Sequence, residues 1–140
     1  MQKQPLIIER TYNAAADKVW SAITDASKMR QWYFDLEEFK PEVGFTFEFS
    51  AECDGLSYLH TCEVTEVVEG KKIVYSWKYR DYPGMSYVMW ELFPEGEKTR
   101  LVLTHTGLET FPKHKDFTTE SFTGGWNYFL GDALKKYLEE

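Results

Sequence analysis

The chain has 140 residues, of which 43% are hydrophobic and 28% charged, and its formal net charge is −7. These values are typical of a single soluble globular domain, which we place over residues 1–140. The acidic balance and the lack of a basic run argue against binding to nucleic acid or to an anionic membrane surface.

The cellular compartment is predicted from three features that the sequence lacks. No apolar run reaches the length of a membrane-spanning helix, and the first residues lack the apolar segment of a signal peptide. The two cysteines, Cys53 and Cys62, form neither a disulfide framework nor a CxxC motif. We therefore expect a cytoplasmic protein with no membrane insertion.

The N-terminal part of the chain predicts a strand followed by two short helices. Residues 6–13 (LIIERTYN) alternate between apolar and polar side chains, as a half-buried strand does. Residues 15–24 carry apolar side chains at helical spacing, which predicts an amphipathic helix. Asp25 or Ser27 would cap a second short helix at its N-terminus.

Five more strands are predicted in series, over residues 45–52, 57–69, 71–79, 85–93 and 99–107. The segments between them are short and rich in turn residues, with Asp54-Gly55 as one example. Short connections between neighbouring strands imply an antiparallel meander.

A long helix is predicted at the C-terminus, from about residue 118 to residue 138. At 100° per residue its apolar arc holds Phe122, Trp126, Phe129, Leu130, Ala133 and Tyr137, with Leu134 and Leu138 at the edge. Gly124, Tyr128 and Gly131 fall on the opposite side, where a smooth strip could receive a second subunit, and so we keep a homodimer as a hypothesis. Gly124 and Gly125 together predict a hinge.

These elements predict an α+β fold. A curved antiparallel sheet of about six strands would wrap around the long C-terminal helix, with two short helices after the first strand. Aromatic residues make up 17% of the chain. In a domain of this size they must either fill the core or line a pocket between the sheet and the helix.

Several segments resemble a known superfamily. Residues 16–32 resemble the helix-helix corner of START-like (SRPBCC, helix-grip) proteins. Residues 64–77, 90–108 and 125–140 are similar to the branch of the activator of 90-kDa heat-shock protein ATPase homologue. The resemblance implies a helix-grip fold with a deep cavity, and a heat-shock chaperone as a partner. It also implies that the chaperone-gripping N-terminal domain of the eukaryotic activators is not in this sequence.

Aromatic side chains are the first candidates for a ligand pocket. Three of them alternate on one strand, and others lie on the apolar arc of the C-terminal helix, so the two groups would face each other. The candidates are Tyr75, Trp77, Tyr79, Trp90, Trp126, Phe129 and Tyr137. They would either line a site for a small hydrophobic or amphipathic molecule or fill a solid aromatic core.

The second group of candidate site residues has polar side chains that the alternation along strands would direct inward. His60, His105 and Arg10 share the inward parity of their strands, and among the strand carboxylates Glu66 also does. The histidines would orient a ligand, join a relay or metal site, or be satisfied within the interior. Arg10 would bind a ligand carboxylate, form an internal ion pair or reach water. His114 lies in a charged loop.

No metal-ligand spacing, phosphate-binding loop or nucleophile motif is present, and so we expect no metal, no cofactor and no catalytic residue. The function we expect is a non-catalytic module that binds a small hydrophobic or amphipathic ligand. Two alternatives are a chaperone-regulating interaction domain and a polyketide cyclase/aromatase-like enzyme. The enzyme would require His60, His105 and Arg10 to converge on one point.

Overall fold

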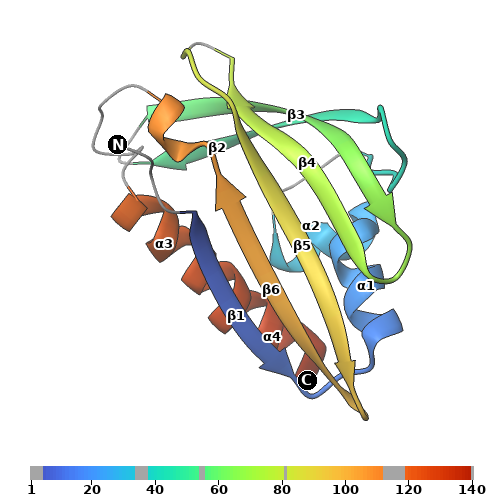
Figure 1. Cartoon of the computed structure of the whole chain (residues 1–140). Coiled ribbons are helices and arrows are strands. Elements are labelled where there is room, and N and C mark those ends of the chain that lie inside the picture. Colours follow the sequence, from blue (N-terminus) through green and yellow to red (C-terminus); the bar gives the residue numbers. More distant parts are fainter. Residues whose placement is uncertain (1–4, 34–37, 54–55, 81, 112–118, 140) are drawn as a thin grey trace.

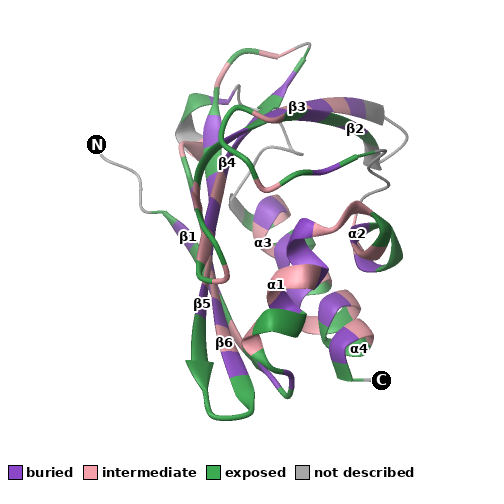
Figure 2. Ribbon diagram, turned by 90° about the vertical axis from the view of Figure 1, so that its right-hand side faces the viewer, coloured by how far each residue is buried: buried purple, intermediate pink, exposed green. Residues whose placement is uncertain are grey.

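Six antiparallel strands of the described residues form one curved sheet, and the helices lie on one face of it (Figures 1 and 2). The computed structural model describes residues 5–33, 38–53, 56–80, 82–111 and 119–139. The strand order is β1-β6-β5-β4-β3-β2. The strands are β1 (Leu6–Tyr12), β2 (Thr46–Cys53), β3 (Leu56–Val68), β4 (Lys72–Tyr79), β5 (Ser86–Glu95) and β6 (Lys98–Thr106).

The helical elements follow β1 and β6. They are α1 (Ala16–Thr24), α2 (Ala26–Trp32), the short 3-10 turn η1 (Leu108–Thr110), α3 (Thr119–Asn127), η3 (Tyr128–Ala133) and α4 (Leu134–Glu139). The last three are consecutive and form the C-terminal helix, which lies along β1 and β6 in Figure 1. The predicted α+β, helix-grip arrangement is confirmed. The predicted turn at residues 54–55 and the loop with His114 lie outside the described residues.

Buried and exposed residues alternate along the strands, and the helices lie on one side of the sheet (Figure 2). On β4, Ile73, Tyr75, Trp77 and Tyr79 are buried, because every second side chain of a strand points to the same face. Asp25 caps α2, accepting a hydrogen bond of 2.9 Å from the backbone N–H of Ser27. No helix in the described part of the chain has the length and apolarity needed to cross a membrane.

A β-bulge in β3 changes the parity expected for Glu66. Val64 pairs with Tyr75, yet Glu66 pairs with Val74, so β3 has one extra residue at this point. The extra residue turns Glu66 to the outside, where it is exposed and forms an ion pair of 3.1 Å with Lys72. The inward parity inferred for Glu66 is therefore wrong.

The C-terminal helix departs from α geometry in its middle. Its buried side chains recur at every fourth residue: Phe122, Trp126, Leu130, Leu134 and Leu138. In a regular α-helix each such step would rotate the side chain by about 40°, and the row would wind away from the sheet. The π-helical segment η3 holds more residues per turn and keeps the row facing the sheet.

Three expectations for this helix change as a result. Phe129, Ala133 and Tyr137 lie at the flank of the buried row and are half-buried, whereas Leu134 and Leu138 lie in it. The irregular segment is η3 and not the predicted hinge at Gly124 and Gly125, which lie within α3. The predicted outer strip is also wrong for Gly131, because a Cβ at this residue would lie 3.5 Å from Arg10 Nε.

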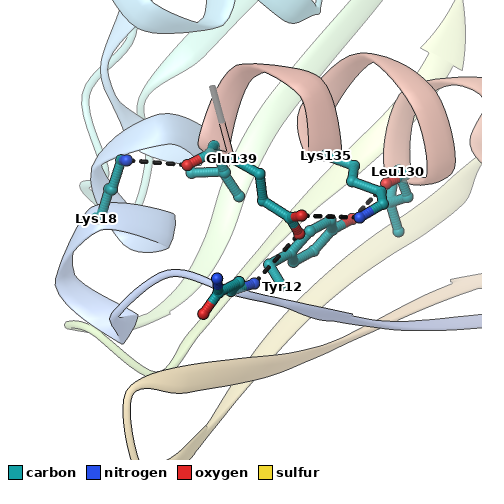
Figure 3. Close-up of polar contacts among 7 residues, drawn as sticks. Tyr12, Lys18, Leu130, Lys135 and Glu139 are labelled. Atoms are coloured by element: carbon teal, nitrogen blue, oxygen red, sulfur yellow. Dashed lines mark hydrogen bonds and ion pairs between the residues drawn. The ribbon is translucent and has the colours of Figure 1, made fainter.

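Polar contacts fasten the C-terminal helix to β1 and α1 (Figure 3). In η3 the N–H of Leu134 donates to the Phe129 carbonyl, five residues earlier, and the Leu130 carbonyl accepts a buried bond of 2.6 Å from the Tyr12 hydroxyl. Lys18 donates to the Leu138 carbonyl at 2.9 Å. The π-helical segment is thus held at one fixed position on the sheet.

Candidate functional site

The aromatic candidates on the strands form the inner surface of the sheet. Tyr75, Trp77, Tyr79 and Trp90 are buried, and the Trp126 ring lies 5.4 Å from that of Trp77 and 5.7 Å from that of Trp90, centroid to centroid. These distances are those of rings in direct contact. The structure therefore brings the strand candidates and Trp126 together as one aromatic layer between the sheet and the C-terminal helix.

Polar atoms within this layer bond to one another. The Tyr75 hydroxyl receives a hydrogen bond of 3.1 Å from Trp90 Nε1 and lies 3.1 Å from the Tyr33 hydroxyl. Trp77 Nε1 donates to the Tyr79 hydroxyl at 3.0 Å. Burial raises the pKa of the Tyr33 and Tyr75 phenols well above the ordinary value, so both phenols are neutral near pH 7.

His105 lies at the centre of a hydrogen-bond chain. The Ser86 hydroxyl donates to the Trp77 carbonyl at 2.8 Å, so His105 Nε2–H donates to Ser86 Oγ at 2.8 Å. His105 Nδ1 then accepts a bond of 3.1 Å from Trp126 Nε1. Both ring nitrogens are used by the neutral tautomer, and burial lowers the pKa of His105 to about 3.

His60 is also a neutral interior group. Its ring is stacked on Phe49 with the centroids 4.4 Å apart, and its Nδ1 lies 3.1 Å from the Tyr58 carbonyl oxygen. Burial lowers the pKa of His60 to about 4, although hydrogen bonds to backbone groups act in the opposite direction. Near His60 and near His105, the described residues hold no group of three or more metal-ligating side chains.

Arg10 lies apart from the two histidines. It is half-buried and donates to Asn127 Oδ1 and to the Glu9 carbonyl oxygen, both at 2.8 Å. Arg10 on β1 is thus paired with the amide of Asn127 on α3. The sequence hypothesis of an internal ion pair had a carboxylate at this place. These hydrogen bonds of His60, His105 and Arg10 go to different groups, and Arg10 lies four residues along β1 from Leu6, the strand partner of His105.

A groove of about 460 Å³ lies between α2 and the C-terminal helix. Its apolar lining is aromatic apart from one methyl group: Trp32, Tyr33, Tyr128, Phe129, Ala133 and Tyr137. Gln31 and Lys136 complete it. This volume falls within the range of small-molecule sites, about 300–1,000 Å³. Phe129 and Tyr137 are the two sequence-predicted site residues that line it.

Tyr33 connects the groove with the aromatic layer. Its ring is half-buried and lines the groove, while its hydroxyl lies beside that of Tyr75 in the interior. The Tyr33 ring is stacked on Trp126 with the centroids 6.2 Å apart and meets Phe129 edge-on at 5.1 Å. Tyr33 thus lies between the groove and the interior rings, together with Trp32 and Phe129.

Sequence reasoning did not select Trp32, Tyr33 or Lys136 as site residues. Trp32 and Tyr33 lie at the end of the short helix α2. The alternation of side chains along strands and the helical wheel of the C-terminal helix therefore give no information about them. The adjacent pair of large rings after a charged helix was the available signal. Their role depends on the packing of α2 against the C-terminal helix.

A second hollow, of about 860 Å³, lies over β2, β3 and β4. Its lining mixes apolar side chains, among them Phe45, Phe47 and Phe49, with the carboxylates of Glu38, Glu48 and Glu63 and the ammonium of Lys78. The groove between α2 and the C-terminal helix has no carboxylate among the described residues of its lining, and it adjoins the aromatic layer through Tyr33. The aromatic groove between α2 and the C-terminal helix is therefore the stronger candidate for a ligand site.

Comparison with solved structures shows the same fold in several proteins. Protein Mll3558 from Rhizobium loti has a TM-score of 0.83 and 26% identity over 96% of both chains. CalU16 from Micromonospora echinospora has a TM-score of 0.70 and 26% identity over 94% of this chain and 74% of its own. DynU16, a protein of the dynemicin biosynthetic locus, has a TM-score of 0.78 and 23% identity over 98% of this chain and 48% of its own.

Sequence comparison identifies the family. No curated protein matches the chain. The family model described as "Activator of Hsp90 ATPase homolog 1-like protein" matches residues 13–139, from the end of β1 to the end of α4. This match includes both helices of the groove and all strands after β1. The chain therefore belongs to the family of activator of Hsp90 ATPase homolog 1-like proteins, a branch of the START-like superfamily.

Proposed function

We propose that this protein is a non-catalytic binding module for a small hydrophobic or amphipathic molecule. The ligand would enter the groove between α2 and the C-terminal helix and reach the space between that helix and the sheet. The observation that supports this most strongly is the continuity of the groove floor, formed by Trp32, Tyr33 and Phe129, with the interior rings. A ligand there would be buried on apolar surface, which is the main source of affinity for such molecules.

Tyr33 would act as the movable side chain of this site. Its ring packs against Phe49, Trp90, Trp126 and Phe129, and its hydroxyl lies 3.1 Å from that of Tyr75, so a ligand would have to replace these contacts. A rotation of the ring away from Tyr75 would open the interior beneath Trp126 and Phe129. A hydroxyl or carbonyl group of the ligand could then replace the Tyr33 hydroxyl as the partner of Tyr75.

The neutral interior supports binding of an uncharged molecular part. No buried side-chain nitrogen or oxygen in the described residues lacks a hydrogen-bond partner. The histidines are neutral, and burial also raises the pKa of the Cys62 thiol. An apolar ligand part would therefore meet no unpaired charge in this region.

The proposal is tested with N-phenylnaphthylamine, an uncharged fluorescent probe that emits strongly in apolar surroundings. Wild type should bind it with saturation. Ala133→Trp should abolish binding, because the new ring would fill the groove that Ala133 lines. Asp132→Trp, on the exposed neighbouring residue, is the matched control and should bind as wild type does. No saturable binding to wild type, or equal binding to both variants, would reject the groove as the site.

A chaperone-regulating role is the second candidate, and the family match is the observation in its favour. The exposed ring of Tyr128, at 58% exposure, offers a contact surface for a protein on the same helix. A measured change in the ATPase rate of a 90-kDa heat-shock protein would support this role, and Tyr128→Ser should reduce the change. No change at a large excess of this protein would reject it.

A further inference from the structure

We propose that the groove prefers anionic amphiphiles and binds them in one orientation, with the anionic group at Lys136 and the apolar part on Trp32 and Tyr33. This inference rests on the proposed function, because it specifies the ligand of the same groove. It rests on the placement of one cation at the rim of an aromatic floor in an otherwise acidic protein.

Lys136 is the cation in the lining of the groove. Of the described residues that line the groove, it alone carries a charge. It is exposed and has no ion pair within the described part of the chain. Asp132, one helical turn earlier, is exposed as well, and no ion pair joins the two. The ammonium group is thus free to bind an anion.

The neighbouring lysine provides a contrast. Lys135 donates to the Glu139 carboxylate at 2.8 Å, and this carboxylate also accepts a bond of 3.2 Å from the N–H of Asn13 (Figure 3). These contacts connect Lys135 through Glu139 to Asn13, at the end of β1. Two successive lysines of one helix therefore have different surroundings, and only the second lies at the groove.

The interior fixes the orientation of the ligand. Moving an ionised group into a low-dielectric region without a partner of opposite charge costs several kcal/mol. Behind Tyr33 the polar groups are phenols, indole N–H groups and imidazoles, and they bond to one another. A carboxylate or sulfonate would therefore stay at the rim, where water and Lys136 solvate it, while its apolar part enters.

The net charge of −7 should increase the preference of an anionic ligand for Lys136 over the rest of the protein surface. A protein with a negative field repels anions from most of its surface, so an anionic amphiphile gains where a free ammonium such as that of Lys136 adjoins apolar surface. The contribution of Lys136 should depend on ionic strength, because salt screens charges that are exposed to solvent.

Two probes with the same ring system test the preference: anilinonaphthalenesulfonate, which is anionic, and N-phenylnaphthylamine, which is not. Lys136→Gln should weaken binding of the anionic probe about three- to fivefold at low salt, the size of one exposed charge interaction. It should leave binding of the uncharged probe unchanged. Added salt should remove the difference between wild type and Lys136→Gln.

Lys71→Gln is the charge-matched control, because Lys71 is an exposed residue of the β3–β4 turn, outside the groove lining. It should bind both probes as wild type does. Equal loss of the anionic probe in both variants would show a general charge effect and overturn the inference. Unchanged affinity of Lys136→Gln for the anionic probe would also overturn it, while saturable binding of the uncharged probe would leave the proposed function in place. If neither probe binds wild type, the proposed function fails and the inference fails with it.

Discussion

The stability of this protein should fall steeply between pH 7 and pH 5, because two histidines are buried in neutral form. His60 is 4% exposed and His105 is 0% exposed, and burial lowers their pKa values to about 4 and about 3. In the unfolded chain both imidazoles have a pKa near 6.5. Below that value the unfolded state binds protons that the folded state does not, so the stability that is present above pH 6.5 is lost as the pH falls.

The magnitude follows from the two pKa differences. Each histidine costs about 1.4 kcal/mol per pH unit once the pH is well below 6.5 and still above the folded pKa. Between pH 7 and pH 5 this gives about 2 kcal/mol for each histidine and about 4 kcal/mol for both. A domain with a typical stability of about 5–15 kcal/mol would lose a large fraction of it. Asp25 and Glu139, whose carboxyl pKa values are lowered, titrate mostly below this range.

Urea unfolding followed by far-UV circular dichroism at both pH values measures this loss. His105→Gln cannot titrate at this residue, so its loss between pH 7 and pH 5 should be about half that of wild type, whatever its stability at pH 7. The imidazole resonances provide a second measurement that needs no variant, since those of His60 and His105 should not titrate near pH 6.5. A wild-type stability that is the same at both pH values, or a His105 resonance that titrates near 6.5, would refute the reasoning.

Further predictions concern the backbone and the helix anchor. Tyr12→Phe leaves a buried helix carbonyl without its hydroxyl partner and should cost about 1–3 kcal/mol in urea unfolding, whereas Tyr128→Phe on the exposed side should cost nothing measurable. Gly107→Ala should cost at least about 2 kcal/mol, since φ is +84° and the new Cβ would lie 2.7 Å from a carbonyl oxygen. Gly96→Ala, with a φ of +69° and no atom within 4 Å, should cost only about 1 kcal/mol, and equal losses would contradict the steric argument. Gly125→Ala meets open space and should stabilise the protein by about 0.5–1 kcal/mol; a loss of stability would show that this glycine has a structural role.

The fold could be predicted from the sequence because its strands carry a strong local signal. The alternation on β4 places Ile73, Tyr75, Trp77 and Tyr79 on one face, and short turns leave few topologies for the meander. The bulge in β3 could not be predicted in this way. An extra residue is needed there to fit β3 onto β4, and that requirement arises only when the two strands pair.

The C-terminal helix shows a second limit of local reasoning. A helical wheel assumes one constant rotation per residue, and the spacing of four between Phe122, Trp126, Leu130, Leu134 and Leu138 contradicts that assumption. The repeat was visible in the sequence, but its meaning depends on the sheet beneath the helix, against which the row of buried side chains must stay in contact. The π-helical segment satisfies this requirement, and the Tyr12 hydroxyl binds the Leu130 carbonyl within it.

The site was predictable only in part. Phe129 and Tyr137 were selected as apolar residues of the last helix, and they line the groove. His60, His105 and Arg10 were selected by strand parity, which gives the direction of a side chain but not its partners. His105 and Arg10 bond to Trp126 and Asn127, which lie on another element far from them in sequence. Trp32 and Tyr33 face the groove only because α2 packs against the C-terminal helix.

Nuclear magnetic resonance of the five tryptophan indole N–H groups tests the proposed binding site most directly. Titration with N-phenylnaphthylamine should shift the Trp32 indole signal most, because Trp32 lines the groove, and the Trp126 signal next, because that ring lies directly behind Tyr33. The Trp20 signal, from a ring on α1 outside the groove lining, should shift least. Saturable shifts in this order are the predicted result. Binding that leaves the Trp32 and Trp126 signals unchanged would contradict a ligand site between α2 and the C-terminal helix.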